Sequence, residues 1–341
     1  MSRDLSIIIR VYNSENIIEE CLKNIINEAK SFNYEIIVVD DCSKDKTADV
    51  VNKFNNIKLI KLKKNMGVGN ARNIGMDEAK YDFLCYIDSD LIISKDSINN
   101  LFSKINQNEE IGSVGAIPVL PNLNKKSWSS NFVALKALFG FREAKEEWDV
   151  SEIQSEFCII KKNFLKKIGG WLPFKKAGGE EFELGYRIIN NKKRNLKISD
   201  ASYTTSWDNL YKRFIKIIER TDKYLNLFIK KKSFESDESF ASMSQGLSSI
   251  FSSFIFFLLI INIFISNELL FYSLFVIFFI QIIVEKNFIL YSFKIFGLKM
   301  LIFSLFAIHI INLGILLGGL LFLFKIPSRV INLRNNKLRS N

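Results

Sequence analysis

The sequence has few of the residues that build disulfide-bonded or zinc-binding proteins. Its four cysteines are widely spaced and form no Cys-x-x-Cys pair, so we expect reduced, mostly buried thiols at Cys21, Cys42, Cys85 and Cys158. The only histidine, His309, lies in a long apolar run. A histidine metal ligand is therefore excluded from the first 300 residues, and we interpret His309 as a structural residue of a membrane region.

The sequence also lacks the patterns expected of a secreted or a disordered chain. The apolar stretch within the first residues, MSRDLSIIIRVYN, is too short for a secretory signal, so we expect the amino-terminal part to stay in the cytosol. Of the 341 residues, 48% are hydrophobic and 24% are charged, which excludes a disordered or fibrous protein. The length suits one large domain or two smaller ones.

The positive charge is unevenly distributed. The formal net charge is +11, and residues 247–341 alone contain 8 basic and 2 acidic residues together with 16 of the 31 phenylalanines. Cations that flank apolar runs are typical of a membrane protein beside an anionic lipid face. Because no basic stripe with interleaved aromatic residues marks a soluble face, the pattern argues against nucleic acid as a partner.

Three long apolar segments predict a membrane region over residues 247–324. Segment 247–265 is uncharged and long enough to cross a bilayer, segment 269–284 is near the lower limit of length, and segment 301–324 is the longest. The short link Asn267-Glu268 predicts that the first two segments form a hairpin. We therefore expect an integral protein of the cytoplasmic membrane, with its amino-terminal domain on the cytosolic face.

The third segment leaves two alternatives open. A complete crossing would place the basic tail 325–341, which includes Arg329 and Arg334, outside the cell, against the positive-inside rule. Either the segment is re-entrant or interfacial, or the rule is broken here. Residues 206–232, which precede the apolar segments, predict a basic amphipathic helix in the headgroup plane, with an ordinary surface helix as the alternative.

Residues 1–205 alternate between short apolar runs and helical patterns. We predict strands at residues 6–9, 35–39, 57–62 and 83–87, with an amphipathic helix over residues 18–29. This alternation predicts an α/β fold with a mostly parallel sheet and helices on both faces. Ligands bind at the carboxyl ends of the strands in such sheets.

Polar and acidic residues follow each of these strands. Asp88-Ser89-Asp90 comes directly after the fourth strand, and two acids one residue apart suit a divalent cation held between protein and phosphate oxygens. Taken alone, this pair also suits a simple turn. The other three strands are followed, in order, by Val11-Tyr12-Asn13 with Glu15, by Asp40-Asp41, and by Asn65-Met66-Gly67 with Arg72.

This order of motifs resembles the family 2 glycosyltransferases, whose catalytic domain has the Rossmann-like GT-A fold. The resemblance covers residues 4–200 and implies a donor half at 1–118 and an acceptor half at 119–205. It implies a nucleotide-sugar donor with Mg²⁺ or Mn²⁺, Asp90 as the principal metal ligand, and Asp88 touching the metal and the ribose. It also implies donor contacts from Val11, Tyr12, Asn13, Glu15, Asp40 or Asp41, Asn65 and Gly67, with Arg72 near the diphosphate.

The acceptor side of the resemblance rests on Gly179-Glu180-Glu181, which looks like the family's Gly-Glu-Asp segment at the head of a helix. Glu181 takes the place of the general base that receives the proton of the acceptor hydroxyl. The resemblance also brings Glu180 and Arg187 to the acceptor side. Trp171, in a Gly-Gly-aromatic turn, either stacks on a sugar ring or belongs to the core.

Three departures from the family pattern bear on the function. Arg10 stands where the first strand usually ends in proline, no histidine lies near Thr204–Trp207 just after the acceptor half, and the Gln-x-x-Arg-Trp signature of processive members is missing. The missing signature favours transfer of one sugar per encounter. The resemblance implies an inverting enzyme, and we expect it to act on a hydroxyl of a lipid-linked or glycan acceptor. The alternatives are an ionised polyprenyl phosphate as acceptor, which needs no base, and a catalytically silent nucleotide-sugar-binding or scaffold protein.

Overall fold

The structure is a computed structural model that describes residues 3–120, 127–141, 146–173, 179–231, 243–265 and 267–338, with only the backbone at 222–224, 226–231, 243–245 and 325–338. The chain forms two compact units. The first comprises Met1–Asn122 with Phe141–Ser206, and the second comprises Leu123–Gly140 with Trp207–Asn341. The division differs from the expected domain 1–205 in one respect, because the described residues 127–140 pack with the carboxyl-terminal helices.

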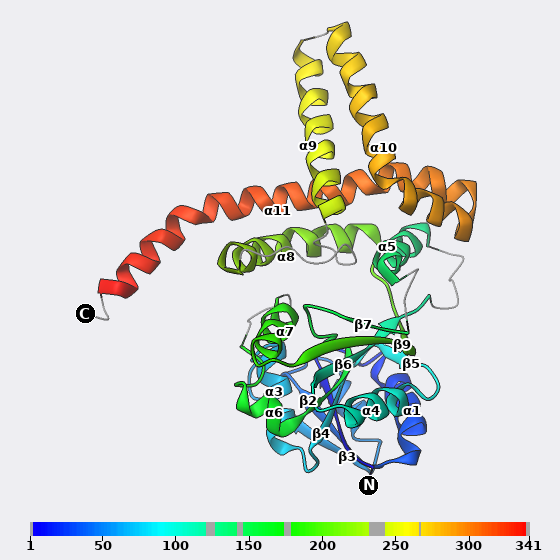
Figure 1. The fold of residues 1–341 in the computed structure, drawn as a ribbon, viewed down its shortest axis with the longest axis vertical. Coiled ribbons are helices and arrows are strands. Elements are labelled where there is room, and N and C mark those ends of the chain that lie inside the picture. Colours follow the sequence, from blue (N-terminus) through cyan, green and yellow to red (C-terminus); the bar gives the residue numbers. More distant parts are fainter. Residues whose placement is uncertain are drawn as a thin grey trace. The chain divides into compact units, whose positions relative to one another are not determined.

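Four parallel strands form one half of the sheet in the first unit (Figure 1). They are β1 (Asp4–Val11), β2 (Asn33–Asp40), β3 (Ile57–Lys61) and β4 (Phe83–Asp88), in the order β3-β2-β1-β4. All four predicted strands are therefore confirmed. Val11 pairs with Asp40 and Arg10 with Asp88, so the carboxyl ends of β1, β2 and β4 meet at one edge.

The other half of the sheet is mixed, which corrects the expectation of a mostly parallel sheet. Its strands are β5 (Leu91–Ile93), β6 (Ile111–Pro118), β7 (Glu147–Asp149), β8 (Phe157–Lys161) and β9 (Arg194–Thr205). Strand β8 pairs antiparallel with β4 and β6, and β9 pairs antiparallel with β5 and β7 but parallel with β6. The antiparallel β4–β8 pair brings the start of β8 beside Asp88.

Helices cover both faces of the sheet because its strands are apolar on both sides. Alternate residues of β1 enter different cores: Ile7 and Ile9 pack with α1 (Ile18–Glu28) and α4 (Ser97–Gln107), and Ile8 packs with α3 (Val68–Glu78) and α7 (Glu180–Asn190). The shorter helices of this unit are α2 (Thr47–Val51), α6 (Lys162–Lys167) and the 3₁₀ turn η1 (Ala29–Ser31). As predicted, the four cysteines are free, and three of them are buried.

The second unit is entirely helical in its described residues. Its helices are α5 (Trp128–Leu138), which the 3₁₀ turn η2 (Phe139–Phe141) follows, α8 (Leu210–Lys231), α9 (Met243–Phe264), α10 (Glu268–Phe296) and α11 (Leu298–Leu338). Three stretches are long and apolar enough to cross a membrane: Gly246–Phe264, Glu268–Phe296 and Leu298–Phe324. The predicted hairpin is confirmed as α9 and α10 (Figure 1), but α10 continues well beyond the expected end at residue 284.

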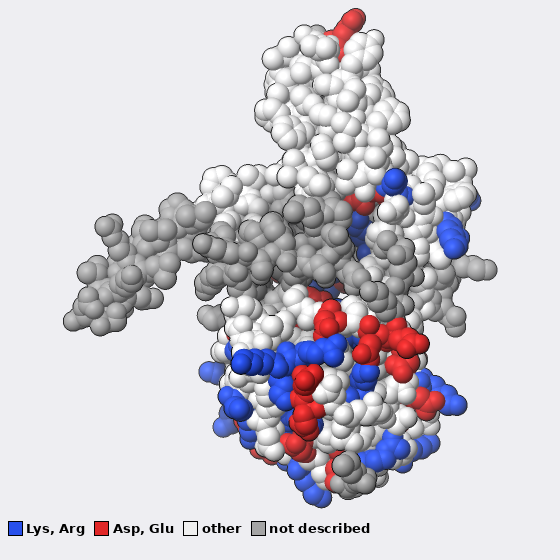
Figure 2. All heavy atoms as spheres, viewed as in Figure 1, with Lys and Arg blue, Asp and Glu red and all other residues white. Residues whose placement is uncertain are grey.

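Charged side chains crowd the surface of the first unit and are almost absent along the α9–α10 hairpin (Figure 2). The side chains of the hairpin are large, apolar and exposed, for example Phe257, Ile263, Phe271 and Phe279. Exposed apolar surface of this extent marks contact with lipid or with another protein. Together with the hydropathy of the helices, it makes the second unit a membrane-associating one.

A buried ion pair fastens α5 to the membrane helices within the second unit. Lys136 Nζ of α5 lies 2.8 Å from Glu285 Oε2 of α10, and the side chains are only 11% and 8% exposed. The same ammonium group lies 4.6 Å from the ring centroid of Phe288, and Phe132 packs edge-on against that ring. The segment 123–140 therefore belongs to this unit through both apolar packing and charge.

Removing one partner of this pair should destabilise the protein strongly. Lys136→Met leaves Glu285 buried without its counter-charge, and such losses cost about 3–5 kcal/mol. Lys136→Met should therefore lower the thermal midpoint of the detergent-solubilised protein, whereas Lys286→Met, at an exposed neighbouring site, should leave it unchanged. The double variant Lys136→Met/Glu285→Leu should recover most of the loss. A double variant as unstable as the single one would contradict this account.

Candidate active site

The loops after β1, β2 and β4 form one continuous rim at the carboxyl edge of the parallel strands. The Asn13 amide donates to Ser43 Oγ at 2.9 Å, and the Lys44 amide donates to Asn13 Oδ1 at 2.9 Å. Asn13 itself has a φ of 51°, a left-handed conformation that asparagine tolerates. Ser14 Oγ lies 3.2 Å from Ser89 Oγ in the Asp88–Asp90 segment. Three of the four predicted motifs are thus connected by hydrogen bonds.

The two acids after β2 have different surroundings. Asp41 is fully buried and accepts hydrogen bonds from the amides of Met66 and Gly67, at 2.6 and 3.1 Å. Arg10 lies 3.6 Å from the same carboxylate. Asp41 therefore holds the 65–67 turn in place, whereas Asp40, whose Oδ1 accepts the Ser43 amide at 2.9 Å, lies at the end of β2 where a nucleoside is expected.

The other residues expected at the donor site are held by hydrogen bonds within the protein or by packing. Glu15 Oε2 accepts the Lys46 amide at 2.8 Å, and Asn65 Nδ2 donates to the carbonyl of Asp41 at 3.2 Å. Tyr12 is half-buried, with the guanidinium of Arg10 5.9 Å from its ring centroid. These side chains fix the shape of the rim, and Val11, which is fully buried, supports it from the core.

Arg72 lies at the centre of this arrangement. Its side chain is 4% exposed, and Nη2 donates to Asp88 Oδ1 at 3.0 Å and to the carbonyl of Ser155 at 2.8 Å. The guanidinium lies 4.6 Å from the ring centroid of Trp171. The other terminal nitrogen, Nη1, is buried and makes no hydrogen bond to the described residues. A buried guanidinium with an unused donor suits the oxygen of an anionic ligand.

Backbone geometry at two glycines makes this position of Arg72 possible. Gly67 precedes α3 with a φ of 86°, which glycine adopts without strain. A Cβ on Gly69 would lie 2.1 Å from the carbonyl oxygen of Leu172, so only glycine allows α3 to approach the segment that contains Trp171. The glycines of the third motif are therefore needed for packing as well as for the turn.

Asp88 and Asp90 lie together with a third acid that sequence analysis did not single out. The Asp88 amide donates to the carbonyl of Glu156 at 2.8 Å. The Glu156 carboxylate accepts hydrogen bonds from the hydroxyl of Tyr203 and from Gln154 Nε2. The only signal for Glu156 is an acid directly before the apolar run of β8, and its meaning depends on the antiparallel β4–β8 pair, which sequence does not reveal.

These acids shift the ionisation of Asp88. Burial raises the pKa of Asp88 to about 6; the Arg72 guanidinium opposes the shift, while the negative charges of Glu156 and Asp90 add to it. A carboxyl group with this pKa is close to half-protonated at mildly acidic pH. The repulsion between neighbouring carboxylates is relieved either by a proton or by a cation.

Two carboxylates of the site suit a divalent cation. Asp90 Oδ2 accepts the Thr205 hydroxyl at 3.1 Å, and Asp88 lies two residues away at the end of β4. Within the described residues, no group of three or more His, Cys, Asp or Glu side chains is arranged to hold a metal ion by itself. Mg²⁺ and Mn²⁺ fit this donor set only if substrate phosphates supply further ligands, which is the usual arrangement for Mg²⁺.

The head of α7 brings two further acids near this site. Gly179 precedes the helix with a φ of 98°. Glu180 is 4% exposed and interacts electrostatically with Arg72, whereas Glu181 is half-buried and its carbonyl accepts the Ile153 amide at 3.2 Å. Residues 174–178, which include the start of the predicted Gly-Gly-Glu-Glu segment, lie outside the described residues.

Trp171 and Arg187 have structural roles. Trp171 is 1% exposed, with Tyr86 packed edge-on at 5.4 Å and Arg72 over its ring, so the core alternative holds and sugar stacking does not. Arg187 donates from Nε and Nη2 to Glu183 and from Nη2 to the carbonyl of Gly170 at 2.7 Å. Its guanidinium therefore fastens the 168–170 turn to α7, which leaves no free donor fork for an acceptor.

Comparison with known proteins gives the same family as the motifs. The description "Glycosyl transferase family 2" matches residues 6–169. Curated relatives include poly-β-1,6-N-acetyl-D-glucosamine synthases of Staphylococcus epidermidis, 25% identical over 175 residues, and of Staphylococcus aureus (strain MSSA476), 26% identical over 172 residues. Each match covers 49% of this chain and 42% of the relative, so the chain matches less than half of those proteins.

The structure of a mannosyltransferase from Pyrobaculum calidifontis in complex with GDP-Man and Mn²⁺ matches over both units. The match covers 94% of this chain and 87% of the other, with 13% sequence identity and a TM-score of 0.58. At this identity the likeness shows the fold alone. The curved mixed sheet, the order of the motifs along its edge and the matched description agree: residues 6–169 match the family 2 glycosyltransferases, and the amino-terminal unit has the GT-A fold.

Proposed function

We propose that this protein is a membrane-anchored, inverting glycosyltransferase that moves one sugar from a nucleotide sugar to a hydroxyl of a lipid-linked or glycan acceptor. The observation that carries the proposal is the buried Arg72, which is held between Asp88 and Ser155 with Nη1 unused. This guanidinium and the acids of Asp88-Ser89-Asp90 lie at the edge where a sheet of this kind binds its ligand.

The donor would lie along the rim after β1, β2 and β4. Tyr12, Asn13 and Asp40 border the expected nucleoside position, and Arg72 is placed for an oxygen of the diphosphate. Asp88 and Asp90 would hold Mg²⁺ or Mn²⁺ together with the diphosphate. Such a cation supplies charge neutralisation for the departing nucleoside diphosphate.

The acceptor hydroxyl would be activated by Glu181. As the oxygen forms its bond to the anomeric carbon, the bond from that carbon to the diphosphate breaks on the opposite side, and the hydroxyl proton passes to the Glu181 carboxylate. Arg72 stabilises the negative charge that develops on the leaving group. The neighbouring acid Glu180 interacts with Arg72, so we assign it to the donor side of the reaction.

The anchoring and the number of transfers follow from other parts of the chain. The α9–α10 hairpin is the expected membrane anchor, and we place the catalytic unit on the cytosolic face of the cytoplasmic membrane, where nucleotide sugars are made. The relatives are named as polymer synthases, but this chain lacks the Gln-x-x-Arg-Trp signature of processive members. We therefore propose a single transfer per encounter.

Glu181→Gln should separate chemistry from donor binding. The variant keeps the size of the side chain and loses its basicity, so transfer should fall about 10²-fold or more, while donor affinity stays within about threefold. Transfer rates and calorimetric donor affinity check this. If Glu181→Gln transfers at a near-normal rate, the base role is wrong and an ionised polyprenyl phosphate becomes the better acceptor.

Asp90→Asn should remove metal-dependent donor binding. The substitution replaces a charged metal ligand by a neutral one of the same size. In about 1 mM Mn²⁺, the affinity for UDP-N-acetylglucosamine or GDP-mannose should therefore fall about tenfold or more. A tenfold loss corresponds to one charged contact worth about 1.4 kcal/mol. Transfer by the unaltered protein should stop in EDTA. Full transfer in EDTA would overturn the metal assignment, and absence of any transfer or hydrolysis would favour the catalytically silent alternative.

Metal-dependent donor binding should also weaken in mild acid. Because the pKa of Asp88 is raised to about 6, the carboxylate is charged at pH 7.5 and takes up a proton as the pH falls through 6, and the cation must then displace that proton. Below about pH 6 the affinity for Mn²⁺ with a nucleotide sugar should fall about tenfold per pH unit. Asp88→Asn should bind more weakly and show a flat profile; an unchanged slope in this variant would assign the titration to another group.

A further inference from the structure

The packing of α8 restricts where its neighbour α11 lies in a membrane. Helix α8 is amphipathic: Lys212 and Lys216 are exposed, whereas Ile217 is 8% exposed. A helix with several lysines and arginines on one face does not cross the hydrocarbon core, because each charge there costs several kcal/mol. Such a helix lies in the headgroup plane with its cations toward water and anionic lipid.

Helix α11 runs side by side with α8 (Figure 1). A Cβ on Gly314 would lie 3.1 Å from Phe214 Cδ2 and 3.3 Å from Ile217 Cγ2. One turn further, a Cβ on Gly318 would lie 2.7 Å from Thr221 Cβ. The contact advances by one turn on both helices, so their axes follow each other at close range. A helix packed lengthwise in this way lies in the same plane as its partner.

A polar network marks the depth of this contact within the second unit. Asn312 Nδ2 of α11 donates to Ser248 Oγ and Ser252 Oγ of α9 at 2.9 Å each, and Gln281 Nε2 of α10 donates to Ser252 Oγ at 2.5 Å. His309 Nδ1 lies 3.3 Å from Ser252 Oγ, and its ring stacks on Phe278. Ser248 and Ser252 lie in the first three turns of α9, so α11 crosses the hairpin in the half of α9 that is farther from the Asn267-Glu268 tip.

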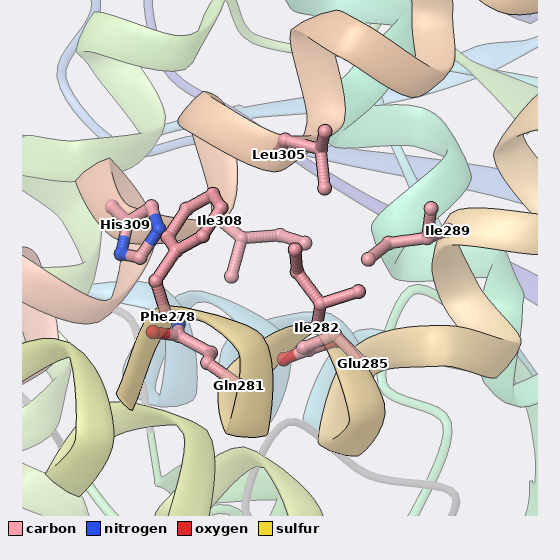
Figure 3. A pocket seen from close by; sticks show the side chains of 8 residues that line it. All are labelled: Phe278, Gln281, Ile282, Glu285, Ile289, Leu305, Ile308 and His309. Atoms are coloured by element: carbon pink, nitrogen blue, oxygen red, sulfur yellow. The ribbon is translucent and has the colours of Figure 1, made fainter. Parts of the chain in front are cut away.

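A cavity at the same level contains further polar groups. It is small and partly open, and Gln281, Glu285 and His309 line it together with apolar residues of α10 and α11 (Figure 3). Gln281 Oε1 is buried and makes no hydrogen bond to the described residues, which suits a water molecule entering from the interface. Polar groups therefore collect at the base of the hairpin, where a membrane surface supplies water.

The length of the hairpin between the polar network and the Asn267-Glu268 tip agrees with a network that lies near the membrane surface. From Ser252 to Phe264, and from Glu268 to Gln281, a helix rises about 18–20 Å. If the network lies about 5–10 Å below the headgroups, as the apolar face of an interfacial helix does, the Asn267-Glu268 tip lies about 23–30 Å deep. The upper end of this range reaches the far side of a hydrocarbon core of about 30 Å. The hairpin alone is then a sufficient membrane crossing.

We propose that α11 lies in the membrane surface over Leu298–Phe324 and does not cross the bilayer, so that α9 and α10 are the only transmembrane helices of the described chain. Its exposed apolar side chains Leu298, Ile302, Leu320 and Leu323, which lie on the side of the helix opposite Gly314 and Gly318, would face the hydrocarbon, and α8 would cover its water-facing side. The basic tail that follows then remains beside the anionic lipid of the side on which the chain entered, which satisfies the positive-inside rule. This inference does not depend on the proposed enzymatic activity.

The location of the two chain ends tests the proposal in the full-length protein. Green fluorescent protein and alkaline phosphatase would be fused in turn to residue 1 and to residue 341 and expressed in a bacterial inner membrane. The proposal predicts that both ends lie on the cytosolic side. Each end should therefore give a fluorescent fusion with green fluorescent protein and an inactive fusion with alkaline phosphatase. Opposite reports from the two ends would overturn it.

The depth profile of α11 distinguishes an in-plane helix from a re-entrant one. Nitroxide labels would be placed one at a time at Ile302, Phe306, Ile310 and Leu323 of the protein in liposomes that contain anionic lipid, with Cys42 replaced by serine. The in-plane helix predicts depths that agree within about 5 Å. A crossing helix would change by about 1.5 Å per residue, or about 30 Å over this range, and a re-entrant one would reach a maximum between the ends; either profile would overturn the proposal.

Two adjacent glycines provide a matched test of the α8–α11 contact. Gly318→Leu should force α11 away from α8, because the added Cβ alone would meet Thr221 and the carbonyl of Ile218. It should make the label at Leu323 deviate from the common depth. Gly319→Leu should leave the profile flat, since nothing lies within 4 Å of its Cβ position. Equal profiles for the two variants would contradict the claim that α8 holds α11 in the plane.

Discussion

The candidate active site depends on one buried guanidinium. Arg72 joins three separate parts of the first unit: it bonds Asp88 at the end of β4 and the carbonyl of Ser155 before β8, and it covers the ring of Trp171. A buried cation requires paired anions or acceptors, so Asp88 and Ser155 must lie where they do. Burial raises the pKa of Asp88, the nearby charges of Glu156 and Asp90 add to the shift, and the guanidinium of Arg72 opposes it. The positive charge of Arg72 and the negative charges of the surrounding carboxylates therefore stabilise one another in the site.

Arg10 forms a second contact between opposite charges, with the carboxylate of Asp41. It replaces the proline that usually ends the first strand in the family, and its guanidinium lies 3.6 Å from the fully buried Asp41. Asp41 also receives the amides of Met66 and Gly67, so this carboxylate holds the loop that leads into α3. The nearby guanidinium compensates the buried negative charge. The departure from the family pattern thus stabilises the turn that positions Arg72, and it gives no support to a loss of function.

Local patterns in the sequence predicted the strands β1 to β4, the hairpin and the clustering of the motifs, because each depends on neighbouring residues. The mixed half of the sheet was not predictable in this way, since the pairing of β4 with β8 joins residues about 70 positions apart. For the same reason Glu156 was missed, and Trp171 was left open until its burial by Tyr86 and Arg72 was known. The grouping of α5 with the carboxyl-terminal helices was not predictable either, because the partner of Lys136, Glu285, is 149 residues away.

Hydropathy alone was least informative for the membrane helices. Leu298–Phe324 is as apolar as a transmembrane helix, yet its position depends on a neighbour whose charges exclude it from the hydrocarbon. The hydropathy of a segment indicates how unfavourable it is to expose that helix to water. It carries no information on a neighbouring helix that covers the same apolar surface. With α8 covering one side of α11 and lipid the other, an apolar helix is stable at the surface. The hairpin has no such cover beyond Gln281, so only there does the apolar sequence by itself require the bilayer interior.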